Sequence, residues 1–260
     1  FKMNEMKVTA FVGSARKKHT YLATERFLKS LQKKGDVDYE IVALADYNLK
    51  TCRGCKLCLD KGEELCPLKD DRDILMEKVR QSDGVVFATP NYSFQVSGLM
   101  KVFLDRFGYV FHRPEYFGKT FTGIVAQGVY GGKEIVKYLD FVGSGMGFNV
   151  VSGFVINTRE PVPLSEKVKT EKAIEKQSLR FYRQLARKEY PSPSMLKLMI
   201  FRMSRTSLKA ALTEDFKDYR HFRDQGWFDN DYYYPVKLNP VKRTLGWVFD
   251  MTARRMAAGN

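Results

Sequence analysis

The sequence contains no long uninterrupted run of apolar residues. A membrane-spanning helix needs about 18 or more, and the most apolar segment, residues 198–201, lies between Lys197 and Arg202. The N-terminal residues also lack the long apolar core and the small-residue cleavage site of a secretory leader. We therefore expect no membrane-spanning helix and a cytoplasmic protein.

Several chemical signatures are missing as well. The chain has neither the G-x-x-x-x-G-K-[ST] motif of nucleoside triphosphatases nor the G-x-G-x-x-G fingerprint of dinucleotide-binding domains. It has 3 histidines, and neither a Ser-His-Asp set nor an H-E-x-x-H motif is evident. These absences argue against nucleoside triphosphates as ligands, against a Rossmann dehydrogenase and against a hydrolase.

The composition is that of a globular protein with a basic bias. Of the 260 residues, 44% are apolar and 28% charged, and the net charge is +14. The excess is denser from residue 180 onward, where 16 Lys and Arg face 8 Asp and Glu. Such a bias attracts anionic cofactors, nucleic acids or anionic membranes, but charge alone selects none of them. A solvated basic face is the plainer interpretation.

All four cysteines lie between residues 52 and 66, in the spacing C-x2-C-x2-C-x7-C. Disulfides fit poorly, because cytosolic proteins rarely keep them and such short loops are awkward to bridge. Cysteines at successive three-residue steps are typical of an iron–sulfur cluster, whereas structural zinc usually takes two separated pairs. The spacing favours a cluster, with metal-free thiols and then zinc as alternatives. The candidate metal ligands are Cys52, Cys55, Cys58 and Cys66.

Strand and helix patterns alternate along the first 190 residues. The strands are expected at 7–12, 38–44, 84–88, 121–126 and 150–156, and the helices at 20–34, 70–80, 97–107, 134–142 and 164–188. The acidic residues 70–73 are expected to cap the second helix. Such alternation predicts an α/β fold with a doubly wound, five-stranded parallel sheet.

Three turns follow strands at the edge of the sheet where such folds bind ligands. Residues 13–20 combine a glycine, hydroxyls and cations at a helix start, which suits a phosphomonoester, although an ordinary basic helix cap is the alternative. Residues 89–94 offer Pro90, Asn91 and Tyr92, and residues 127–132 offer glycines and Tyr130. Together the turns describe a pocket for a planar ring that carries a phosphate.

These motifs resemble the flavodoxin-fold NAD(P)H-dependent FMN reductase-like oxidoreductases, and the iron–sulfur flavoproteins in particular. The resemblance covers residues 6 to about 160 and includes the segments 88–92 and 98–106. It implies that the first turn holds the FMN phosphate and that the other two line the isoalloxazine ring. It also implies a [4Fe-4S] cluster on the cysteine motif, although relatives with similar cysteines bind FMN alone. The implied cofactor-binding residues are Ser14, Arg16, His19, Thr20, Thr89, Pro90, Asn91, Tyr92, Ser93, Gly128, Tyr130 and Gly131. His19 departs from the Ser or Asn that relatives often carry there.

The resemblance implies an enzyme that takes hydride from NAD(P)H onto FMN and passes electrons to a small-molecule or protein acceptor, directly or through the cluster. The flavin supplies the chemistry, so no acid–base residue is assigned. A non-enzymatic, flavodoxin-like electron carrier is the alternative, and the basic charge argues against it. A nucleic-acid partner rests on the net charge alone and is not expected.

Residues 191–260 are expected to form a basic, helical, aromatic-rich extension of a flavin domain at 1–190. Its amphipathic helix, near 195–212, could serve core packing, dimerisation or, least favoured, contact with an anionic membrane. We expect a homo-oligomer, because a single chain would give the cysteine loop little cover and a neighbour's extension could shield it.

Overall fold

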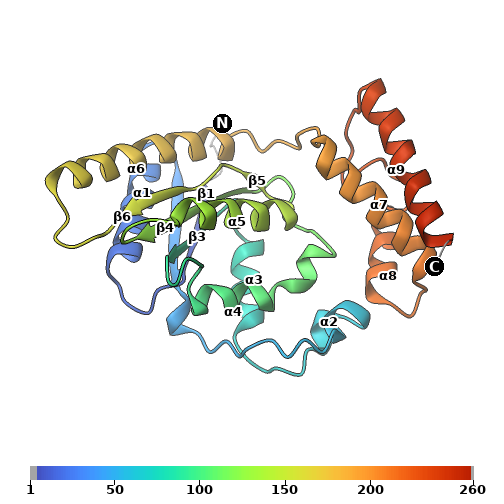
Figure 1. Cartoon of the computed structure of the whole chain (residues 1–260), viewed down its shortest axis with the longest axis horizontal. Helices are drawn as coiled ribbons and strands as arrows, with labels where there is room; N and C mark the ends of the chain where they lie inside the picture. Colours follow the sequence, from blue (N-terminus) through green and yellow to red (C-terminus); the bar gives the residue numbers. More distant parts are fainter. Residues whose placement is uncertain (1–4, 259–260) are drawn as a thin grey trace. The chain divides into compact units, whose positions relative to one another are not determined.

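The fold is known from a computed structural model that describes residues 5–258 (Figure 1). Contacts divide the chain into two compact units. The first consists of the residues up to 53 together with 68–189, and the second of 54–67 together with the residues from 190 on. The grouping of the short cysteine-bearing segment 54–67 with the C-terminal residues was not anticipated from the sequence.

The first unit is built on a fully parallel sheet. Its strands are β1 (Met6–Val12), β2 (Val37–Ala43), β3 (Gly84–Pro90), β4 (Thr120–Gln127), β5 (Asn149–Val150) and β6 (Phe154–Asn157). The order is β2-β1-β3-β4-β5, and β6 also pairs with β4. This is the flavodoxin-like order, which confirms the expected fold class.

The expected fifth strand appears as two short pieces along the same edge of β4. The break falls at residues 151–153, where the chain runs very close to β4. A Cβ atom on Gly153 would lie 2.5 Å from the carbonyl oxygen of Gly123, so only glycine fits there. The sheet is therefore five strand positions wide.

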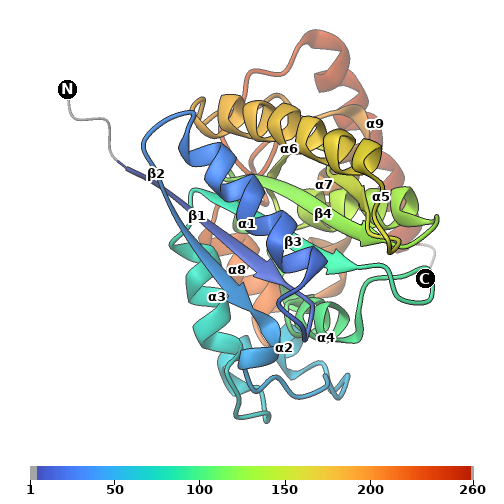
Figure 2. The ribbon, with the colours of Figure 1, turned by 90° about the vertical axis from the view of Figure 1, so that its left-hand side faces the viewer.

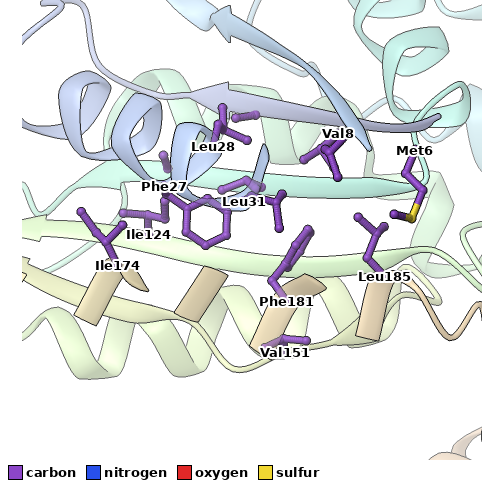
Figure 3. Close-up of a cluster of buried hydrophobic side chains, with 14 of the residues drawn as sticks. Met6, Val8, Phe27, Leu28, Leu31, Ile124, Val151, Ile174, Phe181 and Leu185 are labelled. Atoms are coloured by element: carbon purple, nitrogen blue, oxygen red, sulfur yellow. The ribbon is translucent and has the colours of Figure 1, made fainter. Parts of the chain in front are cut away.

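Helices cover both faces of the sheet. Helices α1 (His19–Gln32) and α6 (Leu164–Leu185) lie side by side on one face (Figure 2). Figure 3 shows the core beneath them, where the rings of Phe27 and Phe181 meet edge to face with 5.7 Å between centroids. In β1, Val8, Ala10 and Val12 belong to this core, as the alternation of side chains along a strand requires.

The other face of the sheet packs against α4 (Gly98–Arg106) and α5 (Gly132–Gly145). Phe11 of β1 stacks on Phe103 of α4 with ring centroids 5.1 Å apart. A Cβ atom on Gly123 would lie 3.0 Å from Leu139 of α5, so β4 and α5 pack closely. Helix α3 (Arg72–Arg80) precedes β3, and short 3-10 helices occupy Leu44–Asp46 and Gly108–Phe111.

The acidic residues before α3 cap the helix only in part: the Asp70 carboxylate accepts a hydrogen bond from the backbone amide of Arg72, the first helical residue, at 3.3 Å. Asp71 stands at the helix start, but its side chain makes no capping bond to the first turn. Its carboxylate instead accepts a hydrogen bond from the Asn48 amide at 2.7 Å. The Asp70 carboxylate accepts one from the Lys50 amide at 2.9 Å. These two residues therefore hold the chain entering the cysteine segment next to the chain leaving it.

The second unit is helical. It contains α2 (Leu57–Asp60), a 3-10 helix at Glu63–Leu65, α7 (Met195–Ala211), α8 (Lys217–Asp224) and α9 (Pro240–Ala258). Helices α7 and α9 lie side by side (Figure 1). Arg202 and Arg205 of α7 reach Asp250 of α9 at 2.9 and 2.8 Å. The sequence did not predict α8.

Aromatic residues of the extension form the core of the second unit. Phe201 of α7 packs against Tyr233 with 4.5 Å between ring centroids, and Trp227 packs against the same tyrosine at 4.7 Å. Phe201, Trp227 and Tyr232 are all buried. Within this unit the aromatic cluster serves packing.

The cysteine segment contacts the C-terminal residues of its own chain. Lys61 donates from Nζ to the Asp215 carbonyl at 3.4 Å, and Arg220 donates to the Lys61 carbonyl at 3.3 Å. Lys217 lies 3.7 Å from Glu64. Helix α8 therefore covers part of this segment, but residues 51–57 stay exposed, as the expectation of little cover from a single chain required. Among residues 5–258, no helix is long and apolar enough to cross a membrane.

Candidate functional site

A cavity of about 140 Å³ opens at the carboxyl ends of the strands in the first unit. It brings together the first and second turns identified from the sequence and the start of the third. The lining residues are Ser14, Arg16, Lys18, His19, Thr20, Pro90, Asn91, Tyr92, Ala126, Gly128 and Thr158. Eight of these eleven belong to the twelve candidate cofactor-binding residues, so the expected ligand-binding edge contains a real cavity.

The first turn presents an anion-binding arrangement to the cavity. Helix α1 starts here with no side-chain cap on its first amides and no acidic residue in its first turn. Unsatisfied N–H groups and the helix dipole make such an end attractive to a phosphate. The Ser14 hydroxyl donates to the Arg16 carbonyl at 2.9 Å, which shapes the turn, and Thr20 is buried at its inner end.

Buried hydrogen bonds tie the first turn to the second. The Ser97 hydroxyl donates to the Gly13 carbonyl and accepts from the Met100 amide, and the Ser97 amide donates to the Thr89 hydroxyl at 3.0 Å. A Cβ atom on Gly13 would lie 2.8 Å from Cβ of Met100. Thr89 thus supports the two turns from inside and does not line the cavity.

The second and third turns are linked through Asn91. Its amide nitrogen Nδ2 donates to the Tyr130 carbonyl at 2.8 Å, and its backbone amide donates to the Ala126 carbonyl at 2.7 Å. Gly131 has φ of +90°, and a Cβ atom there would lie 3.4 Å from the Asn91 amide nitrogen. A glycine at this position lets the third turn approach Asn91 closely.

Exposed aromatic rings stand on the second and third turns. The relative exposures are 50% for Tyr92, 60% for Phe94 and 66% for Tyr130, and the rings of the last two are 5.1 Å apart. Such rings offer a stacking surface to a planar ligand. Phe94 was not among the candidate residues. Its backbone and that of Ser93 adopt positive φ in a tight turn, which the sequence gives no signal for.

His19 lines the cavity but is already engaged. Its Nε2 atom lies 2.8 Å from Oε1 of Glu160, in the loop after β6. This contact joins the start of α1 to the loop that also contributes Thr158 to the cavity. At the position where relatives often carry Ser or Asn, this chain therefore has a histidine that holds a loop at the site.

Four candidates lie beside the cavity and outside its lining: Thr89, Ser93, Tyr130 and Gly131. Three lining residues were missed, namely Lys18, Ala126 and Thr158. Ala126 and Thr158 lie at the carboxyl ends of β4 and β6, so the rule that strand ends meet at one edge could have identified them. Lys18 lies inside the first turn, but its neighbours were predicted to bind the ligand because of their side-chain chemistry, and Lys18 was not.

The four cysteine thiols are suitable metal ligands, but among the described residues they do not cluster around a common point. Cys52 and Cys55 are exposed, and Cys58 and Cys66 are partly buried. Cys52 belongs to the first unit, and the other three belong to the second. Within the part of the chain that the structure describes, no group of three or more His, Cys, Asp or Glu side chains is arranged to hold a metal ion.

Comparison with known proteins shows to which family the chain belongs. Residues 6–160, which span the sheet from β1 through β6, match the model of the NADPH-dependent FMN reductase family. The chain belongs to this NADPH-dependent FMN reductase family. As a member it is an NAD(P)H-dependent flavin oxidoreductase, with FMN as its cofactor and NAD(P)H as its co-substrate.

Several proteins similar to this chain in sequence are iron–sulfur flavoproteins. One from Archaeoglobus fulgidus is 35% identical over 161 residues, which cover 58% of this chain and 72% of that one. Another, from Clostridioides difficile, is 28% identical over 85% of this chain and 97% of its own. Matches to two further relatives cover about half of their lengths. Among solved structures, RosB with a bound 8-formyl flavin phosphate has a TM-score of 0.57 at 13% identity. The match covers 90% of this chain and 92% of the RosB chain, and it shows that the two share a fold.

The site has the features that FMN needs from a member of this FMN reductase family. The uncapped helix end, hydroxyls and cations fit a phosphate, and the exposed rings fit a flat heterocycle. At about 140 Å³ the cavity is smaller than the roughly 300 Å³ or more that encloses a whole drug-sized ligand. It therefore suits the phosphate end, with the ring outside on the aromatic surface.

Proposed function

We propose that the chain binds FMN with its phosphate at the first turn and its ring against the second and third turns, and passes electrons from NAD(P)H to a small-molecule or protein acceptor. The observation that carries this proposal is the convergence of the three strand-end turns on one cavity beside an uncapped helix end. The family membership supports it, because the matched residues 6–160 contain every one of the twelve candidate residues.

In this arrangement the protein binds and orients. The first-turn amides and Ser14 would hydrogen-bond the phosphate, Arg16 would supply a counter-charge, and Asn91 holds the third turn against the second. The rings of Tyr92, Phe94 and Tyr130 offer a flat apolar surface beside the cavity. When bound, FMN would supply the redox chemistry between NAD(P)H and the acceptor, and these residues would hold and orient it. No side chain is assigned as a general acid or base.

We further propose that Cys52, Cys55, Cys58 and Cys66 are the ligands of a [4Fe-4S] cluster. Four thiols within fifteen residues are the donor set such a cluster takes, and the names of several relatives include iron–sulfur. Because these side chains are not gathered among the described residues, the segment would have to rearrange on loading. No electron-transfer step is assigned to it.

The oxidoreductase proposal is tested by mixing the anaerobically purified, FMN-loaded protein with NADPH or NADH in a stopped-flow spectrometer. Loss of the oxidised-flavin absorbance within the turnover time supports it. Flavin that stays oxidised with both nucleotides, but reduces with dithionite, would show that the protein is an electron carrier and not a reductase.

The cluster is tested separately, by iron and acid-labile sulfide analysis of the same anaerobic protein. The proposal predicts about four irons per chain, as the [4Fe-4S] formula requires. The double variant Cys55→Ser with Cys58→Ser should lose the iron and keep FMN. Iron content that is zero in the wild-type protein, or unchanged in the variant, contradicts the cluster assignment without affecting the flavin proposal.

A further inference from the structure

A chain of side-chain hydrogen bonds connects the third turn (residues 127–132) to β6 and α6. Gln127, at the end of β4, accepts a hydrogen bond from the Gly132 amide at its Oε1 atom, with a distance of 2.7 Å. Its Nε2 atom donates to Oδ1 of Asn157, at the end of β6, at 2.9 Å. Asn157 donates in turn from Nδ2 to Oε2 of Glu166, in the first turn of α6, at 3.0 Å. We refer to Gln127, Asn157 and Glu166 as the polar relay.

The direction of the polar relay is determined at both of its ends. The backbone amide of Gly132 can only donate, so it faces the Oε1 atom of Gln127. Hydrogen bonds from Lys169 and Asn157 lower the pKa of Glu166, so this carboxyl group is ionised at neutral pH. An ionised carboxylate only accepts, so Asn157 turns Nδ2 to Glu166 and Oδ1 to Gln127. The Gln127 amide therefore satisfies both of its neighbours in one orientation only.

The third turn is folded closely around the Gln127 side chain. Nε2 of Gln127 also donates to the Val129 carbonyl at 3.3 Å, inside the turn. A Cβ atom on Gly132 would lie 2.6 Å from Oε1 of Gln127, so a glycine there allows this close approach. Helix α5 begins at Gly132 without a side-chain cap from the residue before it, and Gln127 supplies the acceptor for its first amide. One side chain thus holds both ends of the turn.

Two side-chain amides hold successive carbonyls of the third turn. Asn91, from the second turn, donates to the Tyr130 carbonyl, and Gln127 donates to the Val129 carbonyl. The backbone carbonyl of Gln127 also accepts from the amide and the hydroxyl of Thr158, at 2.8 and 3.0 Å, and Thr158 lines the flavin cavity. These backbone contacts do not need the Gln127 side chain, so a substitution there tests the turn without removing the cavity wall.

We propose that Gln127 is a positioning residue for the flavin ring, kept in its orientation by Asn157 and Glu166. This inference rests on the proposed function, which places the ring against the second and third turns and the phosphate at the first. The first turn is held separately, because its Gly13 carbonyl accepts from the Ser97 hydroxyl. Breaking the polar relay should therefore weaken the hold on the ring and leave the phosphate end as it is. A residue that only stabilises the fold would affect both ends or neither.

The test uses full-length apoprotein with two probes: FMN, followed by flavin fluorescence, and inorganic phosphate as a competitor of FMN. Gln127→Met keeps the length of the side chain and removes its hydrogen bonds. It should raise the dissociation constant of FMN about tenfold, the effect of roughly one neutral hydrogen bond. The inhibition constant of phosphate should change by less than about threefold. The visible circular dichroism of bound FMN should also change, because the ring meets a displaced turn.

The matched control is Gln81→Met, the same substitution at an exposed amide that bonds to Glu77. Gln81 precedes β3 and so lies away from the carboxyl ends of the strands. This variant should bind FMN and phosphate as the wild type does, with the same flavin circular dichroism.

Glu166 gives a second, milder comparison at the far end of the polar relay. Glu166→Gln and Glu166→Leu remove the same charge, but only the first keeps an acceptor for Asn157. Glu166→Leu should weaken FMN binding about threefold relative to Glu166→Gln, without a change in the inhibition constant of phosphate.

The outcomes separate this inference from the proposed function. Wild-type apoprotein that binds no FMN, or from which phosphate does not displace it, contradicts the proposed function and removes the inference with it. When the wild type binds FMN and phosphate competes, two results overturn the inference alone. One is FMN affinity and circular dichroism in Gln127→Met that equal those of Gln81→Met. The other is a parallel loss of FMN and phosphate affinity in Gln127→Met.

Discussion

The Arg106 guanidinium lies 2.8 Å from the Asp70 carboxylate, measured from Nη2 to Oδ1, and both side chains are almost completely buried. The other Asp70 oxygen accepts from the Lys50 amide. One carboxylate thus joins the end of α4 to both ends of the cysteine segment. Asp105, the residue before Arg106 in α4, pairs with Lys101.

Arg106→Met should lower the free energy of unfolding by about 3–5 kcal/mol, because it leaves a buried carboxylate without its counter-charge. Lys101→Met is the matched control on the same helix. It breaks an ion pair whose side chains are about half exposed, and should cost about 1 kcal/mol or less. Urea unfolding followed by far-ultraviolet circular dichroism measures both. Equal effects of the two substitutions would mean that the Asp70 pair does not hold α4 to the segment.

Gly13→Ala should destabilise the protein by about 1–3 kcal/mol and weaken FMN binding, because the new Cβ would stand 2.8 Å from Met100 and 2.9 Å from the Ser97 hydroxyl. Gly98→Ala, at the start of α4, meets nothing within 4 Å and serves as the control. It should leave FMN binding unchanged and stabilise slightly. Thermal unfolding and flavin fluorescence titration distinguish the two. A Gly13 variant as stable as the Gly98 variant would disprove the tight packing of the first turn.

Alkaline pH should destabilise the second unit. Burial raises the pKa of Tyr232 and Tyr233 above the ordinary 10, and raises the pKa of Tyr234 to about 12. A tyrosine whose pKa is higher folded than unfolded contributes stability below about pH 10, and this contribution is lost as pH rises through the folded pKa. Tyrosinate absorbance and near-ultraviolet circular dichroism should therefore change together above pH 10. Ionisation of these tyrosines at their ordinary pKa, with the aromatic signal intact, would contradict their burial.

Residues 1–190 could be predicted well because their signals are local. Apolar strands, glycine turns and helical periodicity mark the elements, and parallel topology then forces the turns after β1, β3 and β4 to one edge. That rule placed Ser14 and Tyr92 at one cavity although they are 78 positions apart in the sequence.

The features that the sequence did not predict depend on long-range contacts, which no local sequence pattern indicates. The segment 54–67 joins the C-terminal unit through pairs such as Lys61 with Asp215, which are 154 residues apart. Thr89 looked like a ligand-binding residue by type and position, yet its hydroxyl is used by the Ser97 amide. Phe94 reaches Tyr130 only because two successive residues adopt positive φ, which costs energy for side chains other than glycine.

The most direct test of the site is the dissociation constant of FMN, measured by fluorescence titration of apoprotein. Hydrogen bonds to a charged group contribute about 1.5–3 kcal/mol each, so Ser14→Ala with Arg16→Ala should weaken FMN binding about 100-fold or more. Lys17→Ala removes a cation of the same turn that does not line the cavity, and should change the constant by less than about threefold. An unchanged constant in the double variant, or an equal loss in Lys17→Ala, would contradict the placement of the FMN phosphate at this turn.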